Sequence, residues 1–367
     1  MITARYFEGY YPALERRLED HFSRVEAAFV RQAWRGALVL GGGYGRGEGG
    51  VMLDGGEPEF SNDLDYFLFD SAPEDPSLQA WCREIERIES EELGIDVEIK
   101  CLKADSIGDA SRSMMFADLV AGHAVVAGDA GFLVQMREGL DFSKIAVGEA
   151  TRLLWNRGSG MYFSGCRMWE DEAKTFVIRN HAKLKLALGD AWLCIHGLYT
   201  PQCRERGDRL LNLVLPAELF GLQAWHAEGV EFKFRPFSDG VTWDELEVEA
   251  ACLVEAWAGV YLMAEGRRMV RDYENFAEYL AEPRLIAGAS AMWNVALAVR
   301  DRLKRGGNLR PVMDYPRGAL MRALPCLLGL SEGGVAEAGR FLPSPVSAPE
   351  KAGSWEEIYA KWWACYA

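Results

Sequence analysis

The sequence predicts an α+β fold, in which a small mixed-sheet domain over residues 1–140 precedes an all-helical domain over residues 141–367. Short apolar or alternating segments, which are typical of strands, occur in the first domain between stretches with helical periodicity. In the second domain the apolar residues recur at helical spacing and few strand signals remain. A chain of 367 residues also exceeds the usual size of one domain, so two domains are expected.

The individual elements are expected from the spacing of apolar residues. Amphipathic periodicity in the first 34 residues predicts one or two helices ahead of the first strand. The first domain is then expected to contain strands at 37–40, 64–69, 94–102 and 124–127 and helices at 76–93 and 114–120. The second is expected to contain helices at 147–165, 171–197, 243–281, 285–305, 315–330 and 354–365. Residues 231–234, Glu-Phe-Lys-Phe, are compatible with an isolated strand, and residues 331–353 with a loop.

Composition restricts the class of partner. The formal net charge of −15 disfavours a long nucleic acid, because such binding depends on lysine and arginine neutralising phosphates, and it suits a small or cationic substrate better. No apolar run approaches the length that spans a bilayer, and the first residues lack a leader pattern. A cytoplasmic location without membrane contact is therefore expected. The eight cysteines show no C-x-x-C pair and no zinc-ligand spacing, so they are interpreted as mostly buried reduced thiols.

A glycine-rich turn followed by two carboxylates is the most informative motif. Gly41 to Glu48 follow the first expected strand, and Asp63 and Asp65 begin the next one. Residues two apart in a strand point to the same face, so these carboxylates converge on one place. Hard divalent cations such as Mg²⁺ favour such a group of oxygen ligands. The motif therefore predicts a nucleotide and metal site.

Two other phosphate-binding motifs are disfavoured. A P-loop requires a Gly-Lys dipeptide, which the sequence lacks. Gly45 to Gly50 match the dinucleotide pattern G-x-G-x-x-G, and Asp70 lies twenty residues beyond. That pattern also requires a helix between the glycines and the next strand. Residues 51–59 contain a Gly-Gly pair and a proline, which make such a helix unfavourable.

The segment from Gly41 to Glu48, followed by Ser61-Asn62-Asp63-Leu64-Asp65, resembles the signature of the DNA polymerase β-like nucleotidyltransferase superfamily. Locally it is most similar to the bacterial PII uridylyltransferases, although residues 51–58 look like an inserted loop and the His-Asp dyad of their hydrolase domain is absent. The layout resembles that of aminoglycoside-type nucleotidyltransferases. The resemblance covers residues 36–105 and implies a nucleotidyltransferase fold for the first domain.

The resemblance also implies a third carboxylate on a neighbouring strand. Asp96 and Glu98 lie on one face of the strand expected there, and Glu98 is favoured, although both acids are also compatible with an edge strand that faces solvent. Asp63, Asp65 and the third acid would hold two Mg²⁺ ions, which together stabilise the charges of nucleotidyl transfer. The third acid would also help to deprotonate the acceptor hydroxyl.

Further residues are candidates for nucleotide contacts. The backbone amides of Gly42 and Gly43 are expected to approach the triphosphate because no side chain intervenes. Arg46 is interpreted either as a phosphate contact or as an ion-pair partner of Glu48 or another neighbour.

In the helical domain, residues 171–197 are the candidate lid helix. Its stripe Val177, His181, Leu184, Leu188, Ala191 and Ile195 is expected to be core, with His181 a packed histidine. Lys183 and Asp190 share another face, which would meet the triphosphate and the acceptor or ribose, or else be solvated. A further group lies just beyond this helix and would either add cationic contacts to the ligand or lie on a loop without a binding role. It consists of Tyr199, Arg204, Arg206 and Arg209.

The expected activity is Mg²⁺-dependent transfer of NMP from an NTP, with ATP the first choice, to a hydroxyl of a small molecule. Protein adenylylation or uridylylation is the second alternative. A non-catalytic nucleotide-binding regulator or antitoxin of the same fold is the third, and the three acids argue against it because such a protein has no need of them.

Overall fold

The computed structural model describes residues 6–32, 34–53, 56–237, 240–283, 285, 299–300, 316–342 and 352–366. The chain forms two compact units, and each is described by itself. The first comprises Met1–Ala146, His196–Leu213 and Ala227–Asp239, and the second comprises Val147–Ile195, Val214–His226 and Gly240–Ala367. Two segments from the second half of the sequence therefore belong to the first unit.

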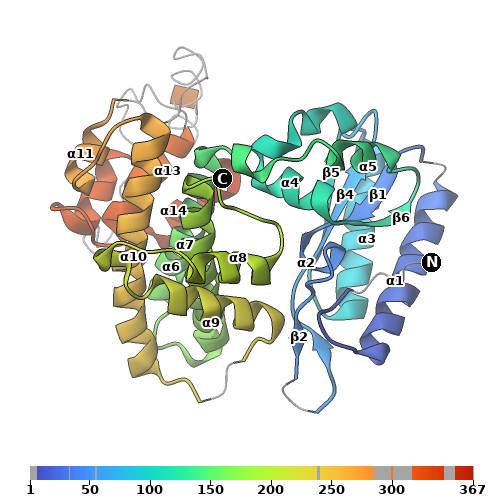
Figure 1. Cartoon of the computed structure of the whole chain (residues 1–367), viewed down its shortest axis with the longest axis horizontal. Coiled ribbons are helices and arrows are strands. Elements are labelled where there is room, and N and C mark those ends of the chain that lie inside the picture. Colours follow the sequence, from blue (N-terminus) through green and yellow to red (C-terminus); the bar gives the residue numbers. More distant parts are fainter. Residues whose placement is uncertain are drawn as a thin grey trace. The chain divides into compact units, whose positions relative to one another are not determined.

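The first unit contains a four-stranded mixed sheet with the strand order β5-β4-β1-β6 (Figure 1). Strand β1 is antiparallel to both β4 and β6, whereas β4 and β5 are parallel. The strands of this sheet are β1 (Ala37–Leu40), β4 (Leu64–Phe69), β5 (Val97–Leu102) and β6 (Ala124–Ala127). The helices are α1 (Pro12–Arg31), α2 (Gly42–Gly45), α3 (Pro76–Leu93), α4 (Met114–Ala121), α5 (Gly131–Arg137), α8 (Cys203–Leu211) and, from Ala227 onward, α9 (Leu222–Phe234), and the single turns of 3₁₀-helix are Ala104–Ile107, Ala110–Arg112 and Phe142–Lys144.

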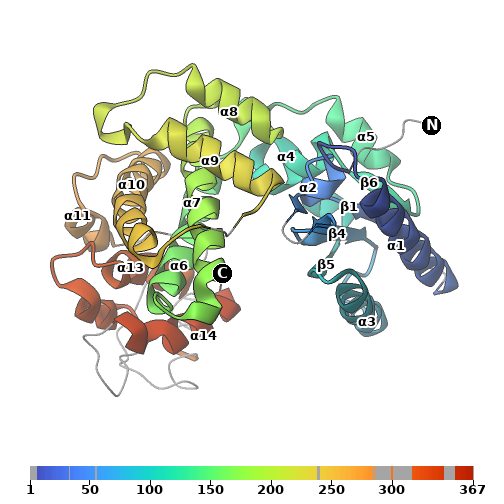
Figure 2. The same cartoon turned by 90° about the horizontal axis from the view of Figure 1, so that it is seen from below.

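Helices cover both faces of this sheet. Helices α1 and α3 lie on one face and α4 and α5 on the other (Figure 2). Because successive strand residues point to opposite faces, β4 contributes to two separate cores. Leu64, Tyr66 and Leu68 pack towards α1 and α3, and Phe67 and Phe69 pack towards α4 and α5. Asp65 shares the face of Phe67, so it lies at the end of the second core.

Local signals explain why several predicted elements are confirmed. Helix α3 begins with Pro76, and the Asp75 side chain accepts the backbone N–H groups of Ser77 and Leu78. It ends at Gly94, whose φ of 74° is the left-handed conformation typical of a helix C-terminus. Strands β1 and β6 also match their predicted residues.

The segment between the glycine turn and β4 is a hairpin. Strands β2 (Val51–Met52) and β3 (Glu59–Phe60) are antiparallel and form a sheet of their own. Helix α2 is a single turn at the glycines themselves, and no crossover helix occurs in the described residues 46–53 and 56–63. The absence of a crossover helix there agrees with the prediction, and the antiparallel pairing of β1 and β4 is a further difference from the parallel strands of a dinucleotide-binding unit.

The second unit is helical. Helices α6, α7 and α10 pack against one another, and α13 packs on α6 and α14 (Figure 1). Its helices are α6 (Val147–Cys166), α7 (Lys174–Ile195), α10 (Trp243–Met269), α11 (Phe276–Ala281), α13 (Pro316–Leu327) and α14 (Glu356–Tyr366), with 3₁₀ turns at Asp171–Ala173, Ala217–Leu219, Gly334–Arg340 and Ala352–Trp355. Within the described residues, no helix has the length and apolarity needed to cross a bilayer.

Several elements differ from the sequence-based expectations. The helix predicted over 243–281 is broken, because Val270 adopts a left-handed φ of 54° and the Asn275 side chain caps a new helix at Phe276. Residues 231–234 form no strand, since they are the last turn of α9. The loop predicted at 331–353 contains a 3₁₀ segment, and most of the helix predicted at 285–305 lies outside the described residues.

Candidate active site

The glycine turn is built directly against Asp65. Gly41 donates its backbone N–H to the carbonyl oxygen of Asp65 at 2.8 Å. Gly42 follows with a φ of 60°, which residues with side chains rarely adopt. A Cβ at this position would lie 2.4 Å from Oδ2 of Asp65. Glycine at 42 therefore allows the backbone to approach the Asp65 carboxylate.

Gly42→Ala is expected to disturb both the turn and the carboxylate. The left-handed backbone costs a residue with a side chain about 1 kcal/mol, and contact with Asp65 should raise the loss of unfolding free energy to about 2–3 kcal/mol. The matched control is Gly94→Ala, because Gly94 has a φ of 74° but nothing lies within 4 Å of its added Cβ. Urea unfolding measures both variants, and equal losses would contradict the close approach at Gly42.

Acidic side chains gather where β4 and β5 begin. Asp65 lies beside Glu98 in the parallel register, so both side chains are on one face of the sheet. Asp63 immediately precedes β4. The Asp65 side chain is 30% exposed and that of Glu98 is 58% exposed. Burial raises the pKa of the Asp65 carboxyl, and the charges of Asp63 and Glu98 raise it further.

Lys100 supplies a neighbouring positive charge that sequence reasoning misses. Its Nζ lies 3.7 Å from Oδ1 of Asp65 and 3.9 Å from Oε2 of Glu98. The available signal is its position two residues after Glu98 on a strand, which places both side chains on one face. The amino group shows that a cation fits beside both carboxylates.

The carboxylates beside Asp65 have the chemistry, but not the arrangement, of a divalent-cation site. A cation would relieve the repulsion around Asp65, and carboxylate oxygens are preferred ligands of Mg²⁺. Across the described part of the chain, no three His, Cys, Asp or Glu side chains already converge to hold a metal ion. Glu98 and Lys100 are both substantially exposed, so their side chains have room to reorient.

The strand register distinguishes the two candidates for the third carboxylate. Glu98 pairs with Asp65, whereas Asp96 precedes β5. The Asp96 side chain is exposed, and its backbone carbonyl accepts the N–H of Leu64 at 2.9 Å. The fold therefore brings Glu98 to Asp65 and uses the Asp96 backbone to align the two strands.

Arg46 lies in a buried ion-pair network behind the glycine turn. Its guanidinium is 3.4 Å from Glu48 and 3.3 Å from Asp118, and its side chain is 12% exposed. The hydroxyl of Tyr199 donates to the Asp118 carboxylate at 3.2 Å. The ion pair with Glu48, one of the two predicted roles of Arg46, is therefore present, and a phosphate contact remains a prediction.

Glu48 connects the turn to two distant segments. Its carboxylate accepts the backbone N–H of Cys203 and the ammonium group of Lys233, each at 2.6 Å. A Cβ built on Gly43 would lie 4.0 Å from Cε of Lys233, so this lysine is next to the glycine turn. Sequence reasoning misses Lys233, because an isolated strand at residues 231–234 gives no reason to place it there. No local pattern in the sequence provides a signal for this contact, which joins residues 185 positions apart.

The arginine group beyond Tyr199 lies on helix α8, so a loop position is wrong for it. Arg206 is 3% exposed and donates to two backbone carbonyls of the preceding turn at 2.9 Å. Arg204 and Arg209 form ion pairs with neighbouring glutamates. These contacts hold the segment together within the first unit.

Lys183 and Asp190, the helical-domain residues predicted to contact the ligand, lie on α7 in the second unit. Asp190 is 7% exposed and lies 3.0 Å from Nε2 of His226, so its side chain is not on a solvated face. Lys183 is half-buried. His181 is 1% exposed and its Nδ1 lies 2.8 Å from Glu249, which confirms the prediction of a packed histidine.

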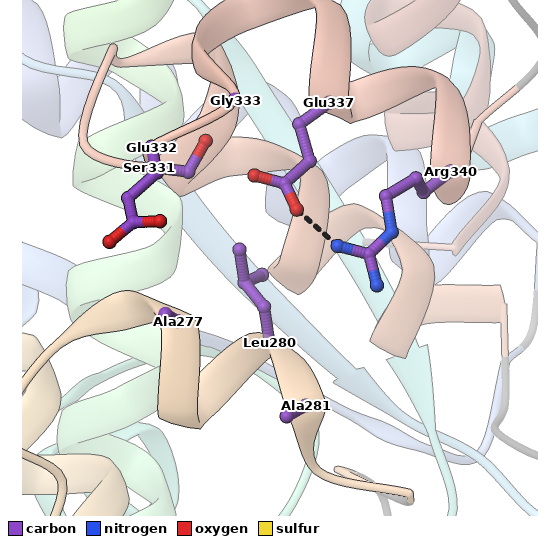
Figure 3. Close-up of a pocket in the computed structure, with 8 residues that line it drawn as sticks. All are labelled: Ala277, Leu280, Ala281, Ser331, Glu332, Gly333, Glu337 and Arg340. Carbon is purple, nitrogen blue, oxygen red and sulfur yellow. Dashed lines mark hydrogen bonds and ion pairs between the residues drawn. The ribbon is translucent and has the colours of Figure 1, made fainter.

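A pocket of about 530 Å³ lies in the second unit between α11 and the 3₁₀ segment Gly334–Arg340 (Figure 3). Glu337 and Arg340 form an ion pair at its wall. Its lining consists of Ala277, Leu280, Ala281, Ser331, Glu332, Gly333, Glu337 and Arg340. None of the predicted site residues is among these, so the pocket is separate from the predicted chemistry.

No protein-family model matches the chain, and neither does any curated protein sequence or solved structure. Support for a function comes from the chemistry and geometry of the residues themselves.

Proposed function

We propose that this protein is a Mg²⁺-dependent nucleotidyltransferase that moves a nucleoside monophosphate, with AMP the first choice, onto a hydroxyl group of a small molecule. The main support is the position of Asp65. The glycine turn closes on this residue from one side, and Glu98 lies beside it in the strand register on the other. Two acidic residues that merely face solvent would need no glycine at position 42. They would also need no second carboxylate beside a partly buried one.

The residues of the chain have distinct roles in this proposal. The backbone amides of Gly42 and Gly43 bind the triphosphate, and Asp63, Asp65 and Glu98 provide oxygen ligands. These carboxylates would hold two Mg²⁺ ions, whose positive charge would offset the charge that develops on the phosphates and the attacking oxygen. Glu98 is exposed enough to reach the acceptor and accept its hydroxyl proton. Lys100 would be displaced from the carboxylates by a metal ion, and its ammonium group would then contact the polyphosphate.

The choice of a small acceptor comes from charge. With a net charge of −15, the protein would repel a polyanionic acceptor and attract a cationic one. A protein acceptor and a non-catalytic regulator are the competing functions, and one assay separates them.

The test is incubation of the full chain with Mg²⁺, a panel of hydroxyl metabolites or a cell lysate, and nucleotides labelled at either the α- or the γ-phosphate. Transfer of the α-label, with the γ-label released in pyrophosphate, is the expected result. Label on a small molecule supports the first choice, and label on a protein supports the second.

Two outcomes would contradict nucleotidyl transfer. Transfer of the γ-label would indicate a kinase instead. Nucleotide binding without any transfer, under every acceptor condition, would favour a non-catalytic regulator.

A further inference from the structure

Two thiols meet between helix α3 and strand β5. The Sγ atoms of Cys82 on α3 and Cys101 on β5 lie 3.4 Å apart. Cys82 is 3% exposed, whereas Cys101 is half-buried and more accessible to solvent. The pair lies on the face of the sheet opposite to Glu98 and Lys100, since Cys101 packs with the core beneath α3.

The two thiols differ in reactivity. Either thiol can be the donor in the hydrogen bond between them; donation by the more buried Cys82 lowers the pKa of the Cys101 thiol and raises the pKa of Cys82. Cys101 is therefore both the more accessible and the more acidic thiol. These are the properties of an attacking thiol, with Cys82 in position to resolve a mixed disulfide.

We propose that Cys82 and Cys101 form a reversible disulfide that joins α3 to β5. With a small disulfide as oxidant, the Cys101 thiolate attacks one sulfur and releases one thiol. The Cys82 thiol then loses its proton and attacks Sγ of Cys101, which releases the second thiol. Two thiols of the protein are oxidised by two electrons, and one molecule of the oxidant is reduced to two thiols.

The surrounding structure allows the required movement. A disulfide bond is about 2.05 Å long, so the sulfur atoms must approach by about 1.4 Å. Strand β5 is at the edge of the sheet and has one strand neighbour, β4. A shift of β5 would also move Glu98 and Lys100, which the same strand carries.

The experiment uses the full chain with Cys252→Ser and Cys365→Ser, because these two thiols are exposed and would form intermolecular bonds. The protein is equilibrated with mixtures of reduced and oxidised glutathione, free thiols are alkylated, and tryptic peptides are analysed without reduction. We expect the peptide ending at Arg83 to be linked to Cys101–Lys103, and dithiothreitol to reverse the link. The unfolding midpoint should rise by about 5 °C on oxidation.

Cys101→Ser and Cys82→Ala should each abolish the link and the rise in the midpoint. The midpoint of each reduced variant checks that it folds. Three outcomes would each overturn the proposal. Cys101 could carry glutathione without a link to Cys82, or one of the two thiols could be linked to another cysteine. Both thiols could also remain free, and therefore alkylated, in fully oxidised glutathione. The readout needs no nucleotide, so its outcome is independent of the proposed transferase activity.

Discussion

Asp65→Asn is expected to lower the rate of nucleotidyl transfer about 1,000-fold, which corresponds to about 4 kcal/mol of transition-state stabilisation. Asp65 is the acid on which the site converges, since Gly42 approaches it from the turn and Glu98 and Lys100 lie beside it. An amide keeps the shape of the side chain but removes the charge that a metal ion requires. The α-label transfer assay measures the loss.

The same substitution should leave the fold intact. Burial raises the pKa of Asp65 in the folded state, so its ionised form opposes folding at pH values above its unfolded pKa. The neutral amide removes this cost. The unfolding midpoint of Asp65→Asn at pH 7 should therefore equal or exceed that of the unaltered protein, and a clear decrease would mean that lost activity reflects lost structure.

Two matched substitutions at the start of β5 distinguish the loss of a negative charge from the loss of a catalytic carboxylate. Glu98→Gln should lower transfer about 100-fold, whereas Asp96→Asn should stay within about threefold of the unaltered rate. Both substitutions remove one acidic charge from neighbouring exposed positions. The reverse order would assign the third carboxylate to Asp96.

Glu89→Gln is expected to have a large effect on stability. Glu89 on α3 is 3% exposed and accepts bonds from His21 at 2.7 Å and Arg24 at 2.8 Å. His21 also lies 2.6 Å from the hydroxyl of Tyr66, the residue after Asp65, so this network supports β4. The variant should lose about 2–3 kcal/mol of unfolding free energy, because it leaves buried polar partners without their charge.

The loss should depend on pH in a defined direction. Burial alone would raise the pKa of the Glu89 carboxyl, but bonds from His21 and Arg24 lower it from 4.5 to about 2. A depressed folded-state pKa adds stability above the unfolded pKa, and this stability is lost as the pH falls from about 4.5 towards 2. Urea unfolding at pH 7, 4.5 and 3 should show a smaller acid loss for Glu89→Gln. Glu91→Gln, at an exposed position on α3, is the control, and parallel pH profiles for all three proteins would contradict this role.

Elements with complete local signals are those that the sequence predicts best. Helix α3 has a capping aspartate, a proline at its first position and a glycine at its end, and its predicted limits are confirmed. Strand β4 has apolar residues on both faces, and the alternation of its side chains predicts which face carries Asp65. The break at Val270 has a weaker signal, because neither glycine nor proline marks residues 270–275 and only the capping Asn275 indicates the new helix.

Contacts between distant segments are the part that local patterns cannot predict. Glu48 bonds to Cys203 and Lys233, which are 155 and 185 positions away. These contacts bind two later segments to the first unit, and the spacing of apolar residues does not predict them. Lys100 was within reach of sequence reasoning, because strand alternation alone places it with Glu98. The identity of the acceptor depends on side chains that no local motif identifies.

The most direct test of the site is Mn²⁺ binding, followed by electron paramagnetic resonance in the presence of a non-hydrolysable ATP analogue. If Asp63 and Asp65, at the start of β4, hold the metal, the unaltered protein should bind about two Mn²⁺ ions with the nucleotide. Asp63→Asn combined with Asp65→Asn should weaken this binding at least 100-fold. Equal Mn²⁺ binding by the two proteins would contradict the assignment of these carboxylates as the metal site.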